Sequence, residues 1–524
     1  VYHPPYIVIE PDYLIDTTTV TNCIKPYGDS AFNHLLSKFG KRESTVYTIL
    51  GDFANQFLDD ALNLASPDYL TSMRKLFAER AIDISACEGI DSNFFAETQR
   101  QFANIKKTVA DIHEMPFMQT GTPHVYIEPS FFCEALGLQG RMDCLICIGE
   151  GKSAFLIELK SGKWDEYRNR SKDEHMMQML LYKEILFYNS GIHQSNVMGN
   201  LLYSRYPKLQ EQRSYQEMVM RALNIRNNII SLELALLQGK GRKIMSSLSP
   251  ESFRLNPQCS DMFWLNYALP PIKEMLDCLH SMDAITTDYF YTFLQFVERE
   301  HFESKMSDSR PDTTRSLSSL WLADTDTKIE NGDILLNLRI LDLRINDGVE
   351  AICLEWGNES VQANFRIGDS VILYHRNTPA DTAVSQHVVR CSVEEYESDR
   401  IWLKLKNNQR DTSIFPSDSL YAIEHDHVES SFGALYANLF SLVTCSKRRR
   451  DLVLCQREPE ENELFLLVGP PGTGKTSVSL KRMVEQHMGK HHNILLLSYT
   501  NRAVDEICGM LDTIEPHPSY VRLG

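Results

Sequence analysis

One stretch decides how this 524-residue chain is interpreted: Gly469-Pro470-Pro471-Gly472-Thr473-Gly474-Lys475-Thr476-Ser477. The apolar run Leu464–Val468 precedes it and predicts a buried strand, and residues 478–487 after it predict a helix. Glycines in a turn between strand and helix let backbone N–H groups converge on phosphate oxygens without a Cβ in the way. The stretch therefore predicts a phosphate-binding loop rather than an ordinary glycine turn.

Within this loop, we expect Lys475 to reach the β- and γ-phosphates of ATP and the Thr476 hydroxyl to hold Mg²⁺. A second apolar run, residues 493–498, predicts another buried strand, and Thr500 and Asn501 follow it. No acidic segment of the magnesium-holding type occurs between the loop and Gly524. The nucleotide-binding fold is therefore expected to be incomplete in this sequence.

Composition places the chain among soluble multidomain proteins. Hydrophobic residues make up 43% and charged residues 23%, and the length exceeds what one core supports. No apolar run approaches the roughly 20 residues that span a bilayer, and no signal peptide opens the sequence. The 12 scattered cysteines favour reduced thiols and a cytoplasmic location. A net charge of −17 disfavours a basic coat but permits a local basic groove.

The first part of the chain alternates helical and extended patterns. In chain order we expect a β-like segment at 6–10, helices at 44–64 and within 68–112, extended residues 125–129, strands at 138–148 and 153–160 that form a hairpin, an amphipathic helix at 174–188 and a strand at 197–203. Helices at 215–238 and 288–301 follow, and the polar stretch 304–316 predicts a linker.

The period then becomes that of a β protein. Short strands are expected at 334–345, 349–356, 370–374, 388–393 and 401–405, which predicts a small barrel. A helix at 430–442 and the basic run Lys447–Arg450 follow, the run being either a solvated helix end or a phosphate contact. The predicted fold is thus multidomain α/β, with domains at 1–309, 317–425 (barrel), 426–455 (helical stalk) and 456–524.

Three residues of the predicted hairpin suggest a catalytic site. If the hairpin turns about Gly151, Asp143 lies opposite Lys160 and all of Asp143, Glu158 and Lys160 share one face. Two carboxylates around one divalent ion, with a lysine beside them, suit metal-assisted phosphodiester hydrolysis. The Leu159 carbonyl would be a further ligand of Mg²⁺ or Mn²⁺. The alternative is a surface hairpin with an Asp–Lys pair, because a register slip of one residue destroys the site.

The same residues belong to a longer pattern: Gly140-Arg141-Met142-Asp143, Glu158-Leu159-Lys160-Ser161-Gly162-Lys163, then Gln178 and Tyr182. This pattern resembles the RecB-family nucleases of the PD-(D/E)XK superfamily. The resemblance implies a restriction-endonuclease-like fold and catalytic roles for Asp143, Glu158, Lys160, Gln178 and Tyr182, with Glu128 assisting. It also implies that the helix near Gly51 is the family's first motif, where the family often has a metal-binding His and this chain has Asn55.

A second resemblance covers residues 317–524. The phosphate loop with Ser498–Asp505 is similar to the first motifs of superfamily-1 helicases, in the branch that contains the nonsense-mediated-decay RNA helicase and the Okazaki-flap helicase–nuclease. In that branch a barrel and a stalk precede the first RecA-like domain, and residues 365–371 resemble the stretch with which such barrels begin. The resemblance implies that Thr500 and Asn501 contact a single strand, although an ordinary strand-to-helix loop is the alternative. Gln456 is the nearest candidate for the adenine-reading glutamine.

The order of nuclease, barrel, stalk and helicase resembles the Okazaki-flap helicase–nuclease family with its later helicase half missing. That family often ties its nuclease domain with an iron–sulfur cluster. Here Cys23 would be the first ligand, but Cys259 and Cys278 are not clustered, and Cys144 and Cys147 lie on opposite strand faces. The cysteine pattern therefore disfavours a cluster and favours core packing.

The sequence thus predicts an ATP-dependent helicase–nuclease that cleaves single-stranded DNA with Mg²⁺ or Mn²⁺, with RNA left open as a substrate. One alternative is a nucleic-acid-dependent NTPase whose nuclease module is inert. Another is a non-catalytic nucleic-acid-binding module. Asn55 favours both alternatives, whereas the complete set of Asp143, Glu158 and Lys160 favours the nuclease.

Overall fold

The computed structural model describes residues 7–40, 44–120, 122–149, 151–166, 168–213, 215–306, 316–357, 363–427, 430–461, 463–490 and 492–523. The chain is a mixed α/β protein that divides into two compact units, Val1–Cys445 and Ser446–Gly524. The division falls inside the segment 426–455 that the sequence predicts as a stalk. Most of the predicted linker, residues 307–315, lies outside the described residues.

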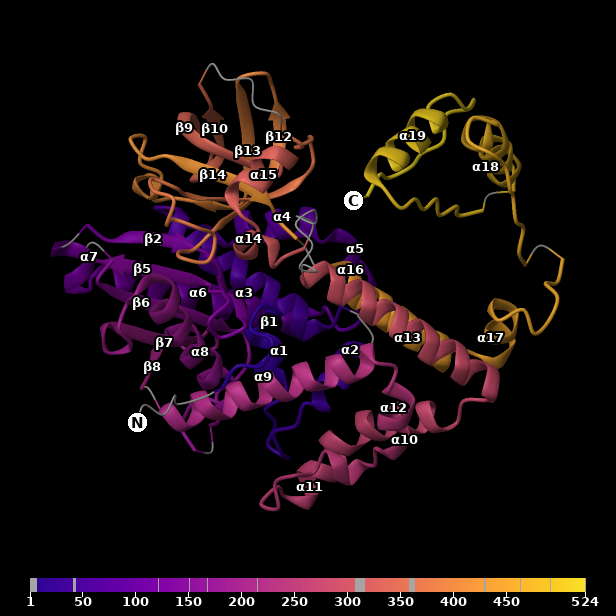
Figure 1. Cartoon of the computed structure of the whole chain (residues 1–524), viewed down its shortest axis with the longest axis horizontal. Helices are drawn as coiled ribbons and strands as arrows, with labels where there is room; N and C mark the ends of the chain where they lie inside the picture. Colours follow the sequence, from indigo (N-terminus) through magenta and orange to yellow (C-terminus); the bar gives the residue numbers. More distant parts are fainter. Residues whose placement is uncertain are drawn as a thin grey trace. The chain divides into compact units, whose positions relative to one another are not determined.

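A five-stranded sheet is the centre of the first unit. Its strands lie in the order β2-β5-β6-β7-β8 (Figure 1), and their bounds are His124–Ile127, Cys144–Ile148, Ser153–Lys160, Val197–Tyr203 and Leu209–Gln212. Strands β6 and β7 run parallel, and the other neighbours are antiparallel. The carboxyl ends of β6 and β7 therefore meet at one edge, so Lys160 pairs with Tyr203.

Helices cover both faces of this sheet. Side chains alternate along a strand, so Leu156 of β6 packs toward α8 and α9, whereas Phe155 packs toward α3, α4 and α6. The helices are α3 (Val46–Asn63), α4 (Tyr69–Glu79), α6 (Ser92–His113), α8 (Asp173–Ser190) and α9 (Gln216–Leu237). The prediction of an amphipathic helix at 174–188 is wrong in one respect, because every residue of α8 from 177 to 186 is buried. This helix packs against α1, α9, β3 and β7 at once, which leaves it little polar surface.

The prediction of one strand over residues 138–148 is wrong. Residues Leu138–Arg141 form β4 in a separate three-stranded sheet, β1-β4-β3, with β1 at Ile15–Asp16 and β3 at Ser130–Cys133. The chain leaves that sheet at Met142 and Asp143 and joins the larger sheet as β5. The predicted β-like segment at 6–10 also forms no strand in its described part, residues 7–10.

The hairpin of β5 and β6 forms, but its turn lies one residue earlier than predicted. Cys144 pairs with Ile157 and Ile148 with Ser153, so Asp143 lies opposite Glu158 rather than opposite Lys160. The predicted and the observed partners of Asp143, Lys160 and Glu158, are two residues apart on β6. Residues two apart on a strand point to the same face of the sheet. The predicted common face of Asp143, Glu158 and Lys160 is therefore retained.

The predicted barrel is confirmed, with one more strand than expected. It closes in the order β10-β13-β12-β11-β14-β9. The strands are β9 (Ile334–Ile345), β10 (Val349–Glu355), β11 (Ser370–His375), β12 (Val389–Tyr396), β13 (Arg400–Gln409) and the unpredicted β14 (Tyr421–His425). Hydrogen bonds join the barrel to the sheets. The Gln409 side chain accepts from Ile127 N–H (2.9 Å) and donates through Nε2 to Ile127 O (2.8 Å), and the Val388 N–H donates to Ser130 O (2.8 Å).

Long helices complete the first unit. In Figure 1, α13 (Ala284–Lys305) runs beside α16 (Ser430–Thr444), and side chains of both join one hydrophobic cluster with α2 (Asn33–Phe39) and α12 (Leu269–His280). A buried ion network joins α2, α9 and α13, because Lys38 Nζ lies 2.6 Å from Glu233 Oε2 and 2.5 Å from Glu298 Oε1. The remaining helices of this unit are α1 (Thr17–Asn22), α5 (Ala81–Ala86), α7 (Pro116–Thr120), α10 (Gly241–Ser247), α11 (Asp261–Phe263), α14 (Ser319–Leu322) and α15 (Thr325–Asn331).

The regular secondary structure described in the second unit consists of helices. It contains α17 (Lys447–Val453), α18 (Lys481–Met488) and α19 (Asn501–Leu511). The predicted buried strands at 464–468 and 493–498 are wrong: residues 464–468 are 45–94% exposed, and neither run pairs with a strand among the described residues. A buried parallel strand needs neighbours in its sheet and helices over its faces. The described part of this unit provides a core of only Val484, Met510, Leu511, Ile514 and their partly buried neighbours.

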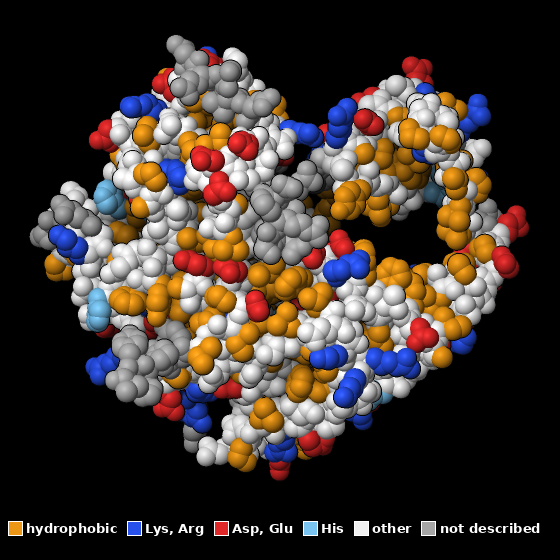
Figure 2. Space-filling view, in the orientation of Figure 1, with side chains coloured by type: hydrophobic (Ala, Val, Ile, Leu, Met, Phe, Trp, Pro, Cys, Tyr) orange, Lys and Arg blue, Asp and Glu red, His pale blue; other side chains and the backbone are white. Residues whose placement is uncertain are grey.

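The surface agrees with the acidic composition. On the face shown in Figure 2, Lys and Arg side chains are scattered among Asp and Glu side chains and form no continuous basic surface. No helix within the described residues is both long enough and apolar enough to cross a membrane.

Candidate functional site

Asp143, Glu158 and Lys160 come together on the α8 face of the five-stranded sheet. Asp143 precedes β5 at the point where the chain leaves the smaller sheet, and Glu158 and Lys160 are two residues apart near the end of β6. Glu158 is 3% exposed, so its carboxyl group is almost completely removed from water. The amide N–H of Leu159 donates to Asp143 Oδ2 at 2.5 Å. Leu159 thus reaches Asp143 through its amide, and its predicted role as a carbonyl ligand stays a prediction.

A chain of hydrogen bonds connects these residues to α8. Lys160 Nζ donates to Glu158 Oε1 (2.8 Å) and to Gln178 Oε1 (2.9 Å). Gln178 Nε2 in turn donates to the Tyr182 hydroxyl (3.0 Å), which donates to the carbonyl of Arg141 (2.8 Å). The spacing of four residues on α8 places Gln178 and Tyr182 on one helix face. The helix therefore fixes the lysine and, through Arg141, the backbone two residues before Asp143.

Gly140 permits this arrangement by lacking a side chain. A Cβ at this position would lie 2.7 Å from Tyr182 Cε1 and 3.0 Å from Thr17 Oγ1. Real Cβ atoms do not approach other atoms so closely, and both neighbours are held in packed helices. The glycine of the sequence pattern thus has a steric role, which is to let Tyr182 reach the Arg141 carbonyl.

The electrostatics of the carboxylates indicate a shared proton or a cation. Burial, together with the negative charge of Asp143, raises the pKa of Glu158 to about 8, although Lys160 opposes this shift. Burial also raises the pKa of Asp143. For Lys160, burial acts to lower the pKa, but the charges of Glu158 and Asp143 outweigh burial and raise it. Lys160 is therefore charged at neutral pH, and one positive charge faces two carboxyl groups.

These residues fit a divalent cation. Glu158 Oε2 is buried and makes no hydrogen bond to the described residues, so it is available as a ligand. Asp143 and Glu158 lie opposite each other across the hairpin, and oxygen ligands of this type are those that Mg²⁺ and Mn²⁺ prefer. A bound cation would replace the proton that the raised pKa of Glu158 otherwise favours.

Two further carboxylates lie near this pair, and one of them was not predicted. Glu128 donates its backbone N–H to the Asp143 carbonyl (3.1 Å), and its Oε2 lies 2.9 Å from Arg141 Nη1. Asp59 on α3 was missed; burial and then the charges of Glu128 and Asp143 raise its pKa well above the usual range. Asp59 could have been found from the sequence, because it follows Asn55 by one helical turn. Asn55 is the position at which the resemblance to RecB-family nucleases implies a histidine.

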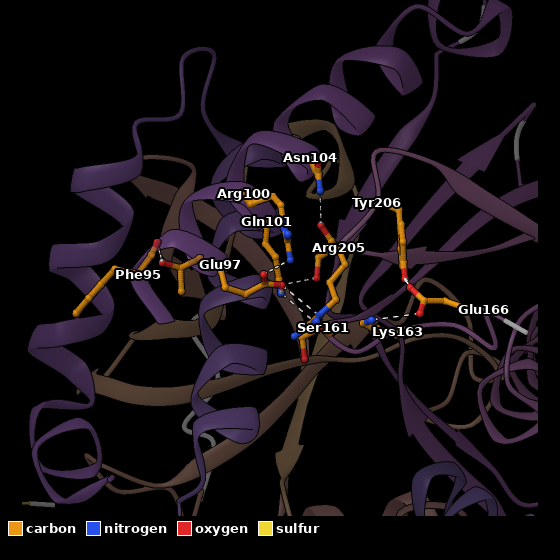
Figure 3. Close-up of polar contacts among 12 residues, drawn as sticks. Phe95, Glu97, Arg100, Gln101, Asn104, Ser161, Lys163, Glu166, Arg205 and Tyr206 are labelled. Carbon is orange, nitrogen blue, oxygen red and sulfur yellow. Dashed lines mark hydrogen bonds and ion pairs between the residues drawn. The ribbon is translucent and has the colours of Figure 1, made fainter. Parts of the chain in front are cut away.

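Polar side chains of α6 hold the turns that follow β6 and β7. Figure 3 shows Gln101 and Asn104 directed toward these turns from α6. Ser204 Oγ donates to Gln101 Oε1 (2.6 Å), Gln101 Nε2 donates to Ser161 O (3.4 Å), and Asn104 Nδ2 donates to Ser204 O (3.0 Å). Ser204 N–H also donates to Lys160 O (3.0 Å), so this network fixes the strand end that carries Lys160.

The predicted phosphate loop forms a turn and a helix start. Gly472 and Gly474 have φ angles of 78° and 81°, the left-handed conformation that glycine adopts without strain. Lys475 Nζ donates to the carbonyls of Gly469 (2.5 Å) and Pro470 (2.7 Å), and Thr473 Oγ1 also donates to the Pro470 carbonyl (2.8 Å). Helical structure begins at Lys475 and continues into α18, so Thr476 and Ser477 lie in its first turn, as predicted.

The residues predicted to contact a single strand lie at the start of α19. Thr500 Oγ1 accepts a hydrogen bond from the Ala503 N–H (3.2 Å) and so caps this helix, and Asn501 is its first residue. Gln456 donates to the Leu454 carbonyl (3.0 Å). The basic run 447–450 opens α17 rather than ending a helix, with Lys447 Nζ 2.7 Å from Asp451 Oδ2.

The cysteines named in the sequence analysis lie in packed surroundings. Cys23 and Cys144 are buried, and Cys23 and Cys259 belong to different hydrophobic clusters. Within the described residues, the group in which three or more His, Cys, Asp or Glu ligand atoms lie close enough to hold an ion is Glu233, Glu298 and His301. The Lys38 ammonium group already contacts both of these glutamates.

Comparison with known proteins identifies one region of the chain. A family model described as an AAA domain matches residues 447–524, which include the phosphate loop and α19. No curated protein matches the chain. Residues 447–524 therefore carry a nucleotide-binding domain like that of superfamily-1 helicases, which supports a helicase-like or NTPase-like function that uses ATP with Mg²⁺.

Proposed function

We propose that this chain combines a metal-dependent nuclease in its first unit with the ATP-binding part of a superfamily-1 helicase in its second. The proposed domains are a nuclease with a helical extension over residues 1–309, a barrel over 317–425, a stalk over 426–455 and the start of a RecA-like domain over 456–524. The observation that carries the nuclease proposal is the pairing of the buried Glu158 with the partly buried Asp143, with one glutamate oxygen lacking a hydrogen bond and Lys160 beside it.

In this proposal Asp143 and Glu158 hold Mg²⁺ or Mn²⁺, and the Leu159 carbonyl is a candidate third ligand. A bound divalent ion supplies an activated water and stabilises charge on the phosphate. Lys160 places a positive charge beside the phosphate oxygens, where negative charge develops during hydrolysis. Gln178 and Tyr182 position Lys160 and the Arg141 backbone through the hydrogen bonds of α8. The proposed reaction is hydrolysis of a phosphodiester in single-stranded DNA.

In the second unit, Lys475 is proposed to leave the Gly469 and Pro470 carbonyls and bind the β- and γ-phosphates of ATP. Thr476 would hold Mg²⁺, and the backbone of Gly469 to Ser477 would surround the phosphates. Thr500 and Asn501 are proposed to contact the strand backbone. Thr500 caps α19 by accepting a hydrogen bond. To contact the strand as well, its hydroxyl would donate its own hydrogen to the strand backbone.

The test is cleavage of labelled single-stranded DNA with Mg²⁺ or Mn²⁺ and without ATP. Wild-type protein is compared with Asp143→Ala, Glu158→Ala and Lys160→Ala. We expect the two carboxylate variants to lose cleavage together with metal binding, and Lys160→Ala to bind metal normally but cleave slowly. Cleavage by Asp143→Ala at the wild-type rate would place the active site elsewhere.

Asn55 supports a second candidate function, in which the nuclease module only binds nucleic acid beside an active NTPase. Asn55 stands where RecB-family nucleases often have a metal-binding histidine, so one ligand of that family's set is replaced here by a neutral amide. Absence of cleavage by wild-type protein in either metal, with retained binding of single-stranded DNA, would favour this function over the nuclease.

A further inference from the structure

A narrow cleft lies between the barrel and the sheet edge that carries Glu128. The enclosed part of this cleft is small, about 20 Å³, and the roughly 360 Å³ of unoccupied space around it includes open solvent at its mouth. Both sides contribute charged or polar side chains: Glu128 and Arg141 from the sheets, and Arg390, Lys406 and Asn407 from the barrel. The barrel residues lie far after Arg141 in the sequence, so this cleft exists only in the folded protein.

Two of the barrel cations lie next to each other on neighbouring strands. Cys391 of β12 pairs with Leu405 of β13, and the residues next to this pair, Arg390 and Lys406, both line the cleft. Like charges directly opposite each other in a sheet destabilise it. Arg141 adds a third cation from the other wall of the cleft. An anion between these three groups would remove their repulsion.

The carboxylates nearby do not balance these cations. Arg141 pairs with Glu128 (2.9 Å), and Arg390 Nε lies 3.3 Å from Asp426 Oδ2 without forming a well-directed hydrogen bond. No described carboxylate lies within ion-pair distance of Lys406. Burial, and then the charges of Arg390 and Arg141, lower the pKa of Lys406, and the opposing charges of Asp426 and Glu128 do not cancel this shift.

The backbone connects two lining residues of the cleft, Glu128 and Arg141, to the candidate metal site. The Glu128 N–H donates to the Asp143 carbonyl, and Arg141 precedes Asp143 by two residues. The paired hydrogen bonds between Gln409 and Ile127 hold the barrel against this edge. A nucleic-acid strand with one phosphate at Asp143 and Glu158 would therefore bring a neighbouring phosphate toward Arg141, Arg390 and Lys406.

We propose that this cleft is a phosphate subsite for the substrate strand, completed by Arg390 and Lys406 of the barrel. The inference rests on the proposed nuclease function, because it takes the strand to be the substrate of the Asp143–Glu158 site. The barrel then contributes directly to substrate binding by the nuclease. The subsite recognises the strand backbone and carries no preference for base sequence.

The first experiment measures binding without cleavage. A labelled six-nucleotide thymidine strand is titrated in EDTA against wild type, Lys406→Glu and the control Lys404→Glu, which changes an exposed lysine of the same strand that faces Glu350 at 3.8 Å. We expect Lys406→Glu to raise the Kd at least tenfold and to reduce the slope of log Kd against log salt by about 1. Lys404→Glu should change the Kd less than twofold. Equal effects of the two variants would overturn the proposal.

The second experiment needs no variant and so is independent of folding effects. Lysines of the wild-type protein are acetylated with and without the same strand, and the modified peptides are quantified by mass spectrometry. Protection of Lys406 greater than that of Lys404 is expected, and equal modification of Lys406 with and without the strand would overturn the subsite.

Cleavage assays separate this inference from the nuclease proposal. Wild-type protein that does not cleave, but that binds the strand through Lys406, would overturn the nuclease and leave the subsite standing. Active cleavage with an unchanged KM in Lys406→Glu would overturn the subsite and leave the nuclease standing.

Discussion

Replacing Glu158 by glutamine tests the electrostatics of the candidate metal site without changing its shape. In the absence of metal, the raised pKa of about 8 keeps Glu158 protonated in the folded protein at pH 7, whereas the unfolded chain has a pKa near the reference value of 4.5. Because the pKa of Glu158 is higher in the folded state than in the unfolded state, its contribution to the free energy of unfolding is complete below about pH 4.5. This contribution is lost as the pH rises toward about 8. At pH 7 the loss is about 3–4 kcal/mol, from about 2.5 pH units at roughly 1.4 kcal/mol each.

The glutamine side chain would be neutral in both the folded and the unfolded state and would escape this loss. In EDTA we therefore expect Glu158→Gln to unfold at a higher denaturant concentration than wild type at pH 7. The difference should shrink toward pH 4.5, grow as the pH rises and level off above about pH 8. Guanidinium unfolding between pH 5 and 9 measures it, with Glu211→Gln, an exposed glutamate of β8, as the control. A destabilised Glu158→Gln at pH 8, or a difference that does not change with pH, would refute the reasoning.

Three other predictions concern single positions. Gly140→Ala should destabilise the first unit by about 1–3 kcal/mol, because its Cβ would meet Tyr182 at 2.7 Å, whereas Gly162→Ala has open space and should be close to neutral in the same unfolding assay. Gln101→Leu should lower the free energy of unfolding by about 2 kcal/mol, because Ser204 and Ser161 lose a buried partner. Gln99→Leu, on the exposed face of α6, should change it little. Similar unfolding midpoints for both variants would contradict the role given to this network. Lys475→Ala should weaken ATP binding more than tenfold, about 1.4 kcal/mol, in a calorimetric titration, and equal affinity would argue against the phosphate loop.

Local patterns in the sequence predicted much of the candidate site. The strand carrying Glu158 and Lys160 and the helix carrying Gln178 and Tyr182 have periods that local geometry determines. The exact pairing of Asp143 was not predicted, because the turn contains glycines at 149 and 151 and the apolar pattern fits either turn position equally well. The face was predictable because both pairings preserve the alternation of side chains.

Features that depend on distant contacts were not predictable. The apolar run 138–148 gives no sign that the chain changes sheets at Asp143, because that change depends on pairing of β4 with β1 and β3. Asp59 lies near the candidate site on α3, and Lys406 lines the cleft from the barrel, and no local period specifies how this helix and the barrel pack. Conversely, residues 464–468 have the composition of a buried strand but remain exposed, because composition does not provide neighbouring strands.

The central claim is that Asp143 and Glu158 together form a divalent-cation site in the first unit. Titration with Mn²⁺, followed by the loss of the free-ion electron paramagnetic resonance signal without nucleotide, tests this claim directly. We predict that wild type and Lys475→Ala bind Mn²⁺ alike and that Asp143→Asn and Glu158→Gln lose this binding. The affinity of wild type for Mn²⁺ should fall about tenfold per pH unit as the pH decreases below about 8, because binding displaces the proton of Glu158. Unchanged Mn²⁺ binding by Asp143→Asn and Glu158→Gln would contradict the claim.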